Sequence, residues 1–94
     1  MFEIKTNNIN EILLIGRFDA SQMEKAYQIL DSIKDNCTVD FKDLQYISSA
    51  GLGALIKTHS RLKNSGNTIK LINMNKHIRE VFKFSALDKV FLIE

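Results

Sequence analysis

The sequence contains little that would divide the chain or anchor it in a membrane. Its 94 residues include no proline and four glycines, and no Gly/Ser-rich stretch has the composition of a linker. The longest aliphatic run, Ile12–Ile15, is far shorter than the roughly 20 apolar residues of a membrane-spanning helix. The first residues lack the apolar core of a signal peptide. We therefore expect residues 1–94 to form one compact domain in the cytoplasm, without insertion into a membrane.

Cysteine and histidine are also scarce. Cys37 is the only cysteine, which excludes an internal disulfide, and such a residue is most simply a buried apolar side chain. His59 and His77 are each isolated, and no ligand spacing typical of a metal site is present. The sequence therefore predicts neither a metal nor a cofactor.

Neither sign of charge dominates the whole chain, but the two halves differ. Residues 1–47 contain five Lys/Arg and eight Asp/Glu, a net −3, whereas residues 48–94 contain eight and three, a net +5. The basic residues of the second half are scattered and lack interleaved aromatic residues on which bases could stack. We therefore expect an ordinary solvated surface and no nucleic-acid partner.

Hydrophobic periodicity in the first part of the chain predicts two strands and a helix. Phe2–Thr6 and the apolar run Glu11–Arg17 fit strands joined by a turn at Asn7–Asn10. From Ser21 the spacing becomes helical, and Ser21 with Glu24 has the spacing of a capping box. One face of this helix carries Met23, Ala26, Tyr27, Leu30 and Ile33.

The second part of the chain continues the alternation. Cys37–Phe41 fits a short strand followed by a loop, and a glycine within Asn64–Asn67 can end the next helix. The apolar face of that helix carries Leu52, Leu55, Ile56, His59 and Leu62. Thr68–Ile72 and Lys89–Ile93 fit further strands, separated by a helix that Asn75 can cap. The fold class is α/β, with the order β-β-α-β-α-β-α-β and a mixed, mainly parallel sheet in which the first hairpin supplies one antiparallel strand.

The segment of greatest chemical interest is Ile47-Ser48-Ser49-Ala50-Gly51-Leu52-Gly53, at the start of the second helix. In open α/β sheets, ligands and partners gather at the carboxyl ends of strands. Ser49 falls at the N-cap of the helix or within one residue of it, which exposes its hydroxyl beside free backbone N–H groups. A phosphate there would be favoured by about 0.3–1 kcal/mol through the helix dipole. It would also change a docking face by about −1.5 to −2 charges.

The same residues fit a purely structural interpretation. Serine caps are common, so Ser48 and Ser49 could do no more than start a helix. A glycine inside a helix costs about 1 kcal/mol relative to alanine. Gly51 and Gly53 therefore serve either close packing of helix on sheet or the access of another protein's active site. Spacing alone does not separate these interpretations.

The sequence resembles the STAS family, the domain of bacterial anti-sigma-factor antagonists, over nearly the whole chain. Asp40 is similar to the aspartate that ends a strand in the family, and Ser48-Ser49-Ala50-Gly51-Leu52 is similar to its signature, Asp/Ser-Ser-Ser/Ala-Gly-Leu. The family's phosphoacceptor, the serine two residues before the glycine, maps to Ser49. The resemblance implies a STAS fold and a switch. The unphosphorylated protein binds an anti-sigma factor that is also a serine kinase and frees the sigma factor; phosphorylation ends the interaction, and a phosphatase resets it.

Two positions depart from the family's pattern. Gly16-Arg17-Phe18-Asp19 is similar to the family's Gly-Glu-Leu-Asp turn, but Arg17 reverses one charge. Ser48 stands where the best-known members have aspartate, which leaves Ser48 as an alternative phosphoacceptor. The partner-binding surface that the resemblance implies comprises Arg17, Asp19, Ser48, Ala50, Gly51 and Leu52.

Two other classes of function compete with this switch. A STAS docking subunit of a transporter or signalling complex, without a phosphorylation cycle, would carry much the same motif. An enzyme is not expected, because the loop has neither of the glycine-rich phosphate-binding patterns and no Ser/His/Asp set or carboxylate pair can be assembled. ATP and Mg²⁺ would belong to the kinase.

Overall fold

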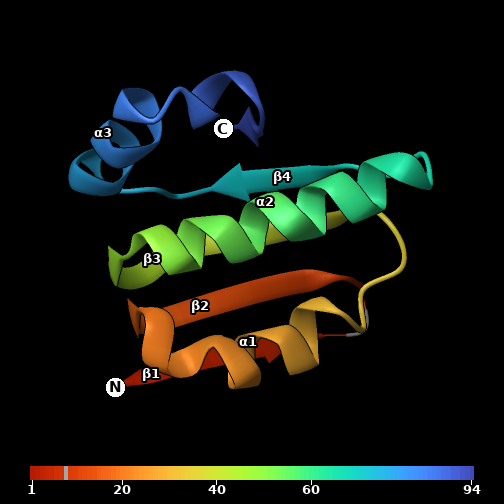
Figure 1. Cartoon of the computed structure of the whole chain (residues 1–94), viewed down its shortest axis with the longest axis horizontal. Coiled ribbons are helices and arrows are strands. Elements are labelled where there is room, and N and C mark those ends of the chain that lie inside the picture. Colours follow the sequence, from red (N-terminus) through yellow and green to blue (C-terminus); the bar gives the residue numbers. More distant parts are fainter. Residues whose placement is uncertain (8) are drawn as a thin grey trace.

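A computed structural model describes residues 1–7 and 9–94, which form a five-stranded sheet with the order β1-β2-β3-β4-β5 (Figure 1). β1 is antiparallel to β2, and the remaining neighbours are parallel, as predicted. The elements are β1 Phe2–Thr6, β2 Glu11–Phe18, η1 Ala20–Gln22, α1 Met23–Leu30, β3 Cys37–Ile47, α2 Ser49–Asn64, β4 Ile69–Ile72, α3 Lys76–Phe84, η2 Leu87–Lys89 and β5 Leu92–Ile93. The predicted order of strands and α-helices is confirmed; the predicted turn at Asn7–Asn10 includes Asn8, which lies outside the described residues.

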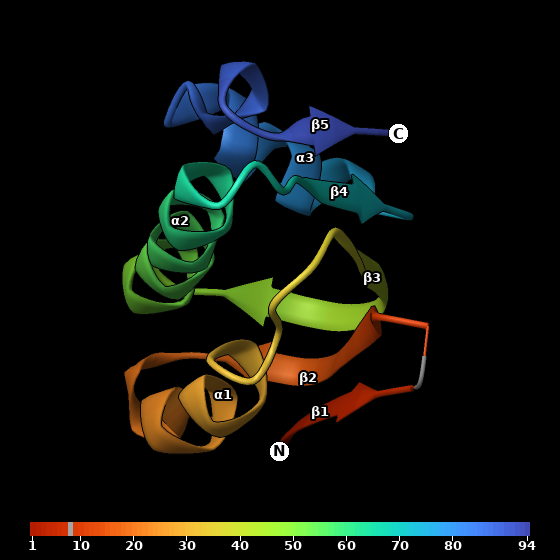
Figure 2. The ribbon, with the colours of Figure 1, turned by 90° about the vertical axis from the view of Figure 1, so that its right-hand side faces the viewer.

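The core lies between the sheet and the helices α1 and α2, which cover the same face (Figure 2). Along β2 the fully buried side chains are Ile12, Leu14 and Phe18, all facing this core, while alternate residues lie on the opposite face. Cys37 is buried as predicted, and burial raises the pKa of its thiol to about 11. The start of α2 and the end of β2 meet at the carboxyl ends of the parallel strands.

The predicted capping box at Ser21 and Glu24 is wrong. The box lies two residues earlier, where the Asp19 carboxylate accepts a hydrogen bond from the Ser21 backbone N–H at 3.0 Å. The Asp19 N–H in turn donates to Gln22 Oε1 at 3.1 Å. Asp-x-x-Gln satisfies the same reciprocal geometry as Ser-x-x-Glu, so a 3₁₀ turn precedes α1.

β3 is also longer than predicted. It runs over 11 residues, Cys37–Ile47, and no loop separates Phe41 from the second helix. Its pairing with β2 shifts twice, between Leu13 and Ile15 and between Gly16 and Arg17, and each shift inserts one extra residue into β3. These bulges break the alternation of apolar and polar residues, so a continuous strand has the sequence pattern of a strand followed by a loop. The strand leads to the start of α2 through Ser48 alone.

The ends of the later helices follow the sequence signals. Gly66 adopts φ +80° and donates its N–H to Lys63 O at 2.9 Å, while Asn67 N–H reaches Leu62 O at 2.8 Å, which is a Schellman motif. Asn75 caps α3 by accepting from Ile78 N–H at 2.9 Å, as predicted. Within residues 1–7 and 9–94, no helix has both the length and the apolar character needed to cross a bilayer.

The last predicted strand is shortened at its start. Lys89–Ile93 was expected to be a strand. Lys89 instead belongs to the 3₁₀ turn Leu87–Lys89, and β5 comprises only Leu92–Ile93. The turn follows Ala86, whose φ is +60°. Its hydrogen bonds hold the chain in a tight reversal, because both Val90 and Phe91 donate to Leu87 O.

Candidate functional site

The start of α2 is capped by Ser48 and not by Ser49. Ser48 has an extended backbone, and its Oγ accepts a hydrogen bond from Gly51 N–H at 3.2 Å. Ser49 is the first helical residue, within the one-residue range that the sequence allowed. The two neighbouring hydroxyls therefore differ: that of Ser48 is engaged in the cap on a half-buried residue, whereas Ser49 is exposed.

The first turn of α2 is suited to an anion. By helix geometry the N–H groups of Ser49 and Ala50 have no acceptor within the helix, and the first turn contains no acidic residue. Negative charge at such an end is favoured by the helix dipole. In the described part of the chain the Ser49 hydroxyl makes no hydrogen bond. The Ser49 hydroxyl thus has no part in the hydrogen bonding of the described structure.

The two glycines of the signature have different environments. A Cβ on Gly51 would lie 2.9 Å from Ile47 Cγ1 and 3.0 Å from Phe18 O, so the helix start is pressed against the end of β2. A Cβ on Gly53 would meet nothing within 4 Å. Gly51 therefore serves close packing of helix on strand, while Gly53 leaves an open surface. Gly51 is itself buried, so its predicted contribution to the partner-binding surface is indirect.

The turn after β2 is joined directly to this helix start. Ser48 N–H donates to Phe18 O at 2.9 Å, which places the Gly16-Arg17-Phe18-Asp19 turn beside the signature. We call residues 17–19 and 48–52 together the serine rim. Within it Arg17 and Ser49 are exposed, and Asp19, Ser48, Ala50 and Leu52 are half-buried.

The charges of the serine rim are held in fixed positions. Asp19 accepts hydrogen bonds from the Ser21 hydroxyl at 2.6 Å and the Ser21 N–H at 3.0 Å, and these bonds lower the pKa of its carboxyl, with a smaller contribution from Arg17. The Arg17 guanidinium lies 4.3 Å from the centre of the Tyr46 ring, its neighbour in the sheet register. An ionised carboxylate and a stacked guanidinium therefore stand on either side of Phe18, whose carbonyl bonds to Ser48 at the start of α2.

Gly16 has a steric role at the same turn. Its φ is +90°, and a Cβ there would overlap the carbonyl group of Met1, which accepts a hydrogen bond from Arg17 N–H at 2.9 Å. The absence of a side chain at Gly16 thus allows the Met1 carbonyl to pack against β2. The sequence signal for this role is the glycine that opens the turn motif.

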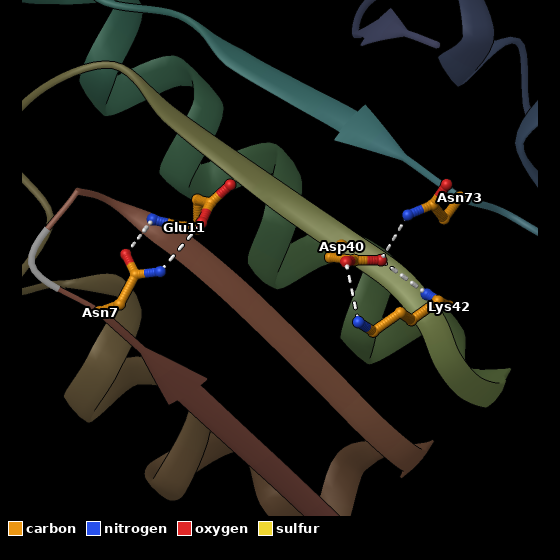
Figure 3. A network of polar contacts seen from close by, with 5 residues as sticks. All are labelled: Asn7, Glu11, Asp40, Lys42 and Asn73. Atoms are coloured by element: carbon orange, nitrogen blue, oxygen red, sulfur yellow. Dashed lines mark hydrogen bonds and ion pairs between the residues drawn. The ribbon is translucent and has the colours of Figure 1, made fainter.

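The resemblance implied that Asp40 ends its strand, but the structure places Asp40 elsewhere. It lies within β3, seven residues before Ile47, on the face opposite α1 and α2 (Figure 3). Its Oδ1 accepts hydrogen bonds from Lys42 N–H at 2.9 Å and from Asn73 Nδ2 at 3.1 Å. Asp40 therefore stabilises the first bulge of β3 and is not part of the serine rim.

Tyr46 is the residue of the site that sequence reasoning missed. Its ring supports Arg17 only because the two bulges of β3 place it opposite that residue. A simple parallel register, extrapolated from the pairing of Glu11 with Thr38, would place a different residue there. In the sequence, the one signal for this role of Tyr46 is that an aromatic residue stands near the end of β3.

Comparison with known proteins assigns the chain to a family. Residues 10–94 match the family model described as "Mlab, STAS domain". Since the match covers most of the chain, the protein belongs to the STAS domain family.

Solved structures of anti-sigma-factor antagonists share its fold. Unphosphorylated SpoIIAA is similar with a TM-score of 0.79 and 20% identity, covering 100% of this chain and 88% of that one. The phosphorylated form of SpoIIAA, a Bacillus cell-fate determinant, has a TM-score of 0.72 and 18% identity, with coverage of 100% and 91%. An antagonist from Mycobacterium paratuberculosis has a TM-score of 0.81 and 15% identity, with coverage of 99% and 83%. The fold is therefore the SpoIIAA-like STAS fold.

Proposed function

We propose that this protein is an anti-sigma-factor antagonist controlled by phosphorylation of Ser49. In the unphosphorylated form, the serine rim binds an anti-sigma factor that is also a serine kinase, and the sigma factor is released. Phosphorylation by that kinase ends the interaction, and a phosphatase restores it. Residues 1–94 act as one STAS domain in the cytoplasm, and catalysis and ATP belong to the kinase, not to this chain. The exposed Ser49 hydroxyl, at the first helical position and beside the Asp19 turn, is the observation that carries the proposal.

Ser49 is favoured over Ser48 as the phosphoacceptor because their hydroxyls have different roles. A phosphate on Ser48 would disturb the bond from Gly51 N–H, and losing a serine cap costs about 0.5–2 kcal/mol. A phosphate on Ser49 leaves that cap in place and faces the positive end of the α2 dipole. Modification of Ser49 is therefore compatible with an intact fold.

The switch would act through charge at the surface. A phosphate adds about −1.5 to −2 charges at neutral pH. Asp19 is ionised at neutral pH, as an aspartate ordinarily is, and the bonds from Ser21 lower its pKa further; Arg17 is the rim's one cation. Phosphorylation would therefore turn a nearly balanced surface into an anionic one and repel the partner that docked there.

The decisive experiment is an in vitro kinase assay with mapping of the site. The protein is incubated with candidate serine-kinase anti-sigma factors and ATP, and the modified residue is identified by mass spectrometry. We expect the label on Ser49, with Ser49→Ala unlabelled and Ser48→Ala still labelled. Label on Ser48 would reassign the site. Absence of label with every candidate kinase, together with retained binding, would favour the docking-subunit alternative.

A further inference from the structure

A second surface lies between α3 and β5, separated from the serine rim by β4 in the sheet order. It is a hollow of about 550 Å³ whose apolar floor includes the buried Met74 and Phe91 and the more exposed Leu92. We call it the α3–β5 hollow. Its rim along α3 carries three cations at helical spacing, Lys76, Arg79 and Lys83. The combination is an apolar floor under a row of positive charges.

The cations of this rim have no side-chain partners among residues 1–7 and 9–94. Among the described residues, no hydrogen bond or ion pair involves the side chains of Lys76, Arg79 or Lys83. Elsewhere lysines do pair, as Lys70 does with Glu94 at 3.4 Å. Two carboxylates, Glu80 and Asp88, also line the hollow, so its lining has three cations against two anions. Positive charge is left available to a binding partner.

One exposed apolar side chain, Leu92, lines the same hollow, and two more lie close to it in the sequence. Of the described large hydrophobic residues that are exposed, Phe84 at 89%, Leu92 at 56% and Val90 at 46% fall in the last eleven residues. The apolar face of α3 itself is used by the core, because Ile78 and Phe82 of that helix are fully buried. An exposed apolar residue beside unpaired cations, as Leu92 is, is typical of a protein-docking surface.

We propose that the α3–β5 hollow binds an acidic, partly apolar segment of another protein. Carboxylates of that segment would contact Arg79 and its neighbouring lysines, and a large apolar side chain would lie on the floor beside Leu92. Among the described residues β5 is an edge strand of the sheet, and an extended peptide segment can pair with an edge strand. The proposal is independent of Ser49 and of phosphorylation.

The chemistry of the hollow disfavours other anionic partners. A nucleic-acid backbone or a lipid surface carries closely spaced negative charges throughout, so some of its phosphates would lie near Glu80 and Asp88, which repel them. α3 cannot lie with its apolar face in a bilayer, since Ile78 and Phe82 are used by the core. A peptide can place its carboxylates against the cations and leave the two acidic side chains in water.

A display selection tests the proposal and needs no identified partner. A random peptide library is selected on the full chain, and the bound peptides are sequenced and their contacts mapped by ¹⁵N NMR shifts. We expect peptides rich in Asp and Glu with one large apolar residue, and shifts at residues 76–93. The variant Arg79→Glu should weaken binding at least tenfold, and Leu92→Ser should weaken it also. Lys34→Glu, which makes the same charge change at an exposed loop position, should not.

Arg79→Glu is a suitable probe because it should fold. The position is exposed, and a glutamate there has Lys83 four residues later, a favourable pair on a helix. Circular dichroism checks the fold before binding is measured. The proposal is overturned by selected peptides that are not acidic, that bind Arg79→Glu equally well, or that shift other surfaces. It is equally overturned if no peptide is enriched, if anionic vesicles bind the hollow, or if sedimentation shows a second copy occupying it.

Discussion

The two surfaces of this protein are built in opposite ways. At the serine rim nearly every group is held in place, since Gly51 packs on Phe18, Ser48 caps α2 and Asp19 holds the turn before α1. At the α3–β5 hollow the charged side chains are free and the strand is two residues long. The rim presents one free hydroxyl from a rigid frame, whereas the hollow presents several side chains that can adapt.

This difference matches what each surface would have to do under the two functions proposed above. A modification switch needs its acceptor in one position, so that a kinase and a phosphatase find the same geometry. A surface for a variable segment gains from side chains that can rearrange around it, because each added contact is weak and replaceable. Substitutions at the rim can test whether it is rigid for these reasons.

The largest effect should follow from Gly51→Ala. The new methyl group would lie 3.0 Å from Phe18 O, a backbone atom, and 2.9 Å from Ile47 Cγ1, so the Ile47 side chain or the packing of α2 on β2 must shift. Overpacking of this kind costs about 1–3 kcal/mol. The matched change Gly53→Ala meets nothing and should stabilise the helix by up to about 1 kcal/mol. Urea unfolding of both variants measures the difference; equal effects would contradict the close packing of Gly51.

The next effect concerns binding and not stability. Ser49→Asp adds a negative charge at the exposed start of α2, and we expect at least a tenfold loss of affinity for the partner kinase, about 1.4 kcal/mol. Ser49→Ala should bind as the wild type does but should no longer be released by ATP. Calorimetry with each variant gives the affinities. If Ser49→Asp and Ser49→Ala bind equally, charge repulsion is not the basis of the switch.

A smaller effect should distinguish the two serines. Ser48→Ala removes the acceptor of Gly51 N–H, and the loss of such a cap costs about 1 kcal/mol. Ser49→Ala removes a hydroxyl that bonds nothing in the described part of the chain and should leave the free energy of unfolding nearly unchanged. Thermal or urea unfolding of the pair checks this. An equal loss in both variants would mean that the capping role is shared.

The order of elements and the place of the signature could be predicted because they depend on local signals. Periodicity located the helices, Asn75 and Gly66 marked helix ends, and the serine pair was placed to within one residue. The bulges of β3 could not be predicted, since an inserted residue disturbs the pattern in the same way as a loop does. The error there also misplaced Asp40.

Contacts between elements that are distant in the sequence could not be predicted either. Arg61 of α2 donates to Leu30 O and Ile33 O at 2.8 Å and so holds the end of α1. Nothing local to Arg61 indicates this role, because it depends on how two helices pack. The support of Arg17 by Tyr46 likewise depends on strand register. What the sequence predicts least well at the serine rim is therefore which side chains orient its charges.

The smallest effect should be a pH dependence carried by Asp19. Its pKa in the folded protein is lowered, first by the hydrogen bond from the Ser21 hydroxyl, below the ordinary value of 3.8. A lowered pKa means that the ionised form stabilises the fold above pH 3.8, and that this contribution is lost as the pH falls through the folded-state pKa. Asp19→Asn should therefore flatten the loss of stability on acidification, whereas Asp43→Asn, at an exposed residue of β3, should not. Unfolding measured between about pH 2 and 6 compares the slopes. Parallel curves for Asp19→Asn and the wild type would show that the carboxylate does not hold the turn, and the rim would then owe its rigidity to Gly51 and the Ser48 cap alone.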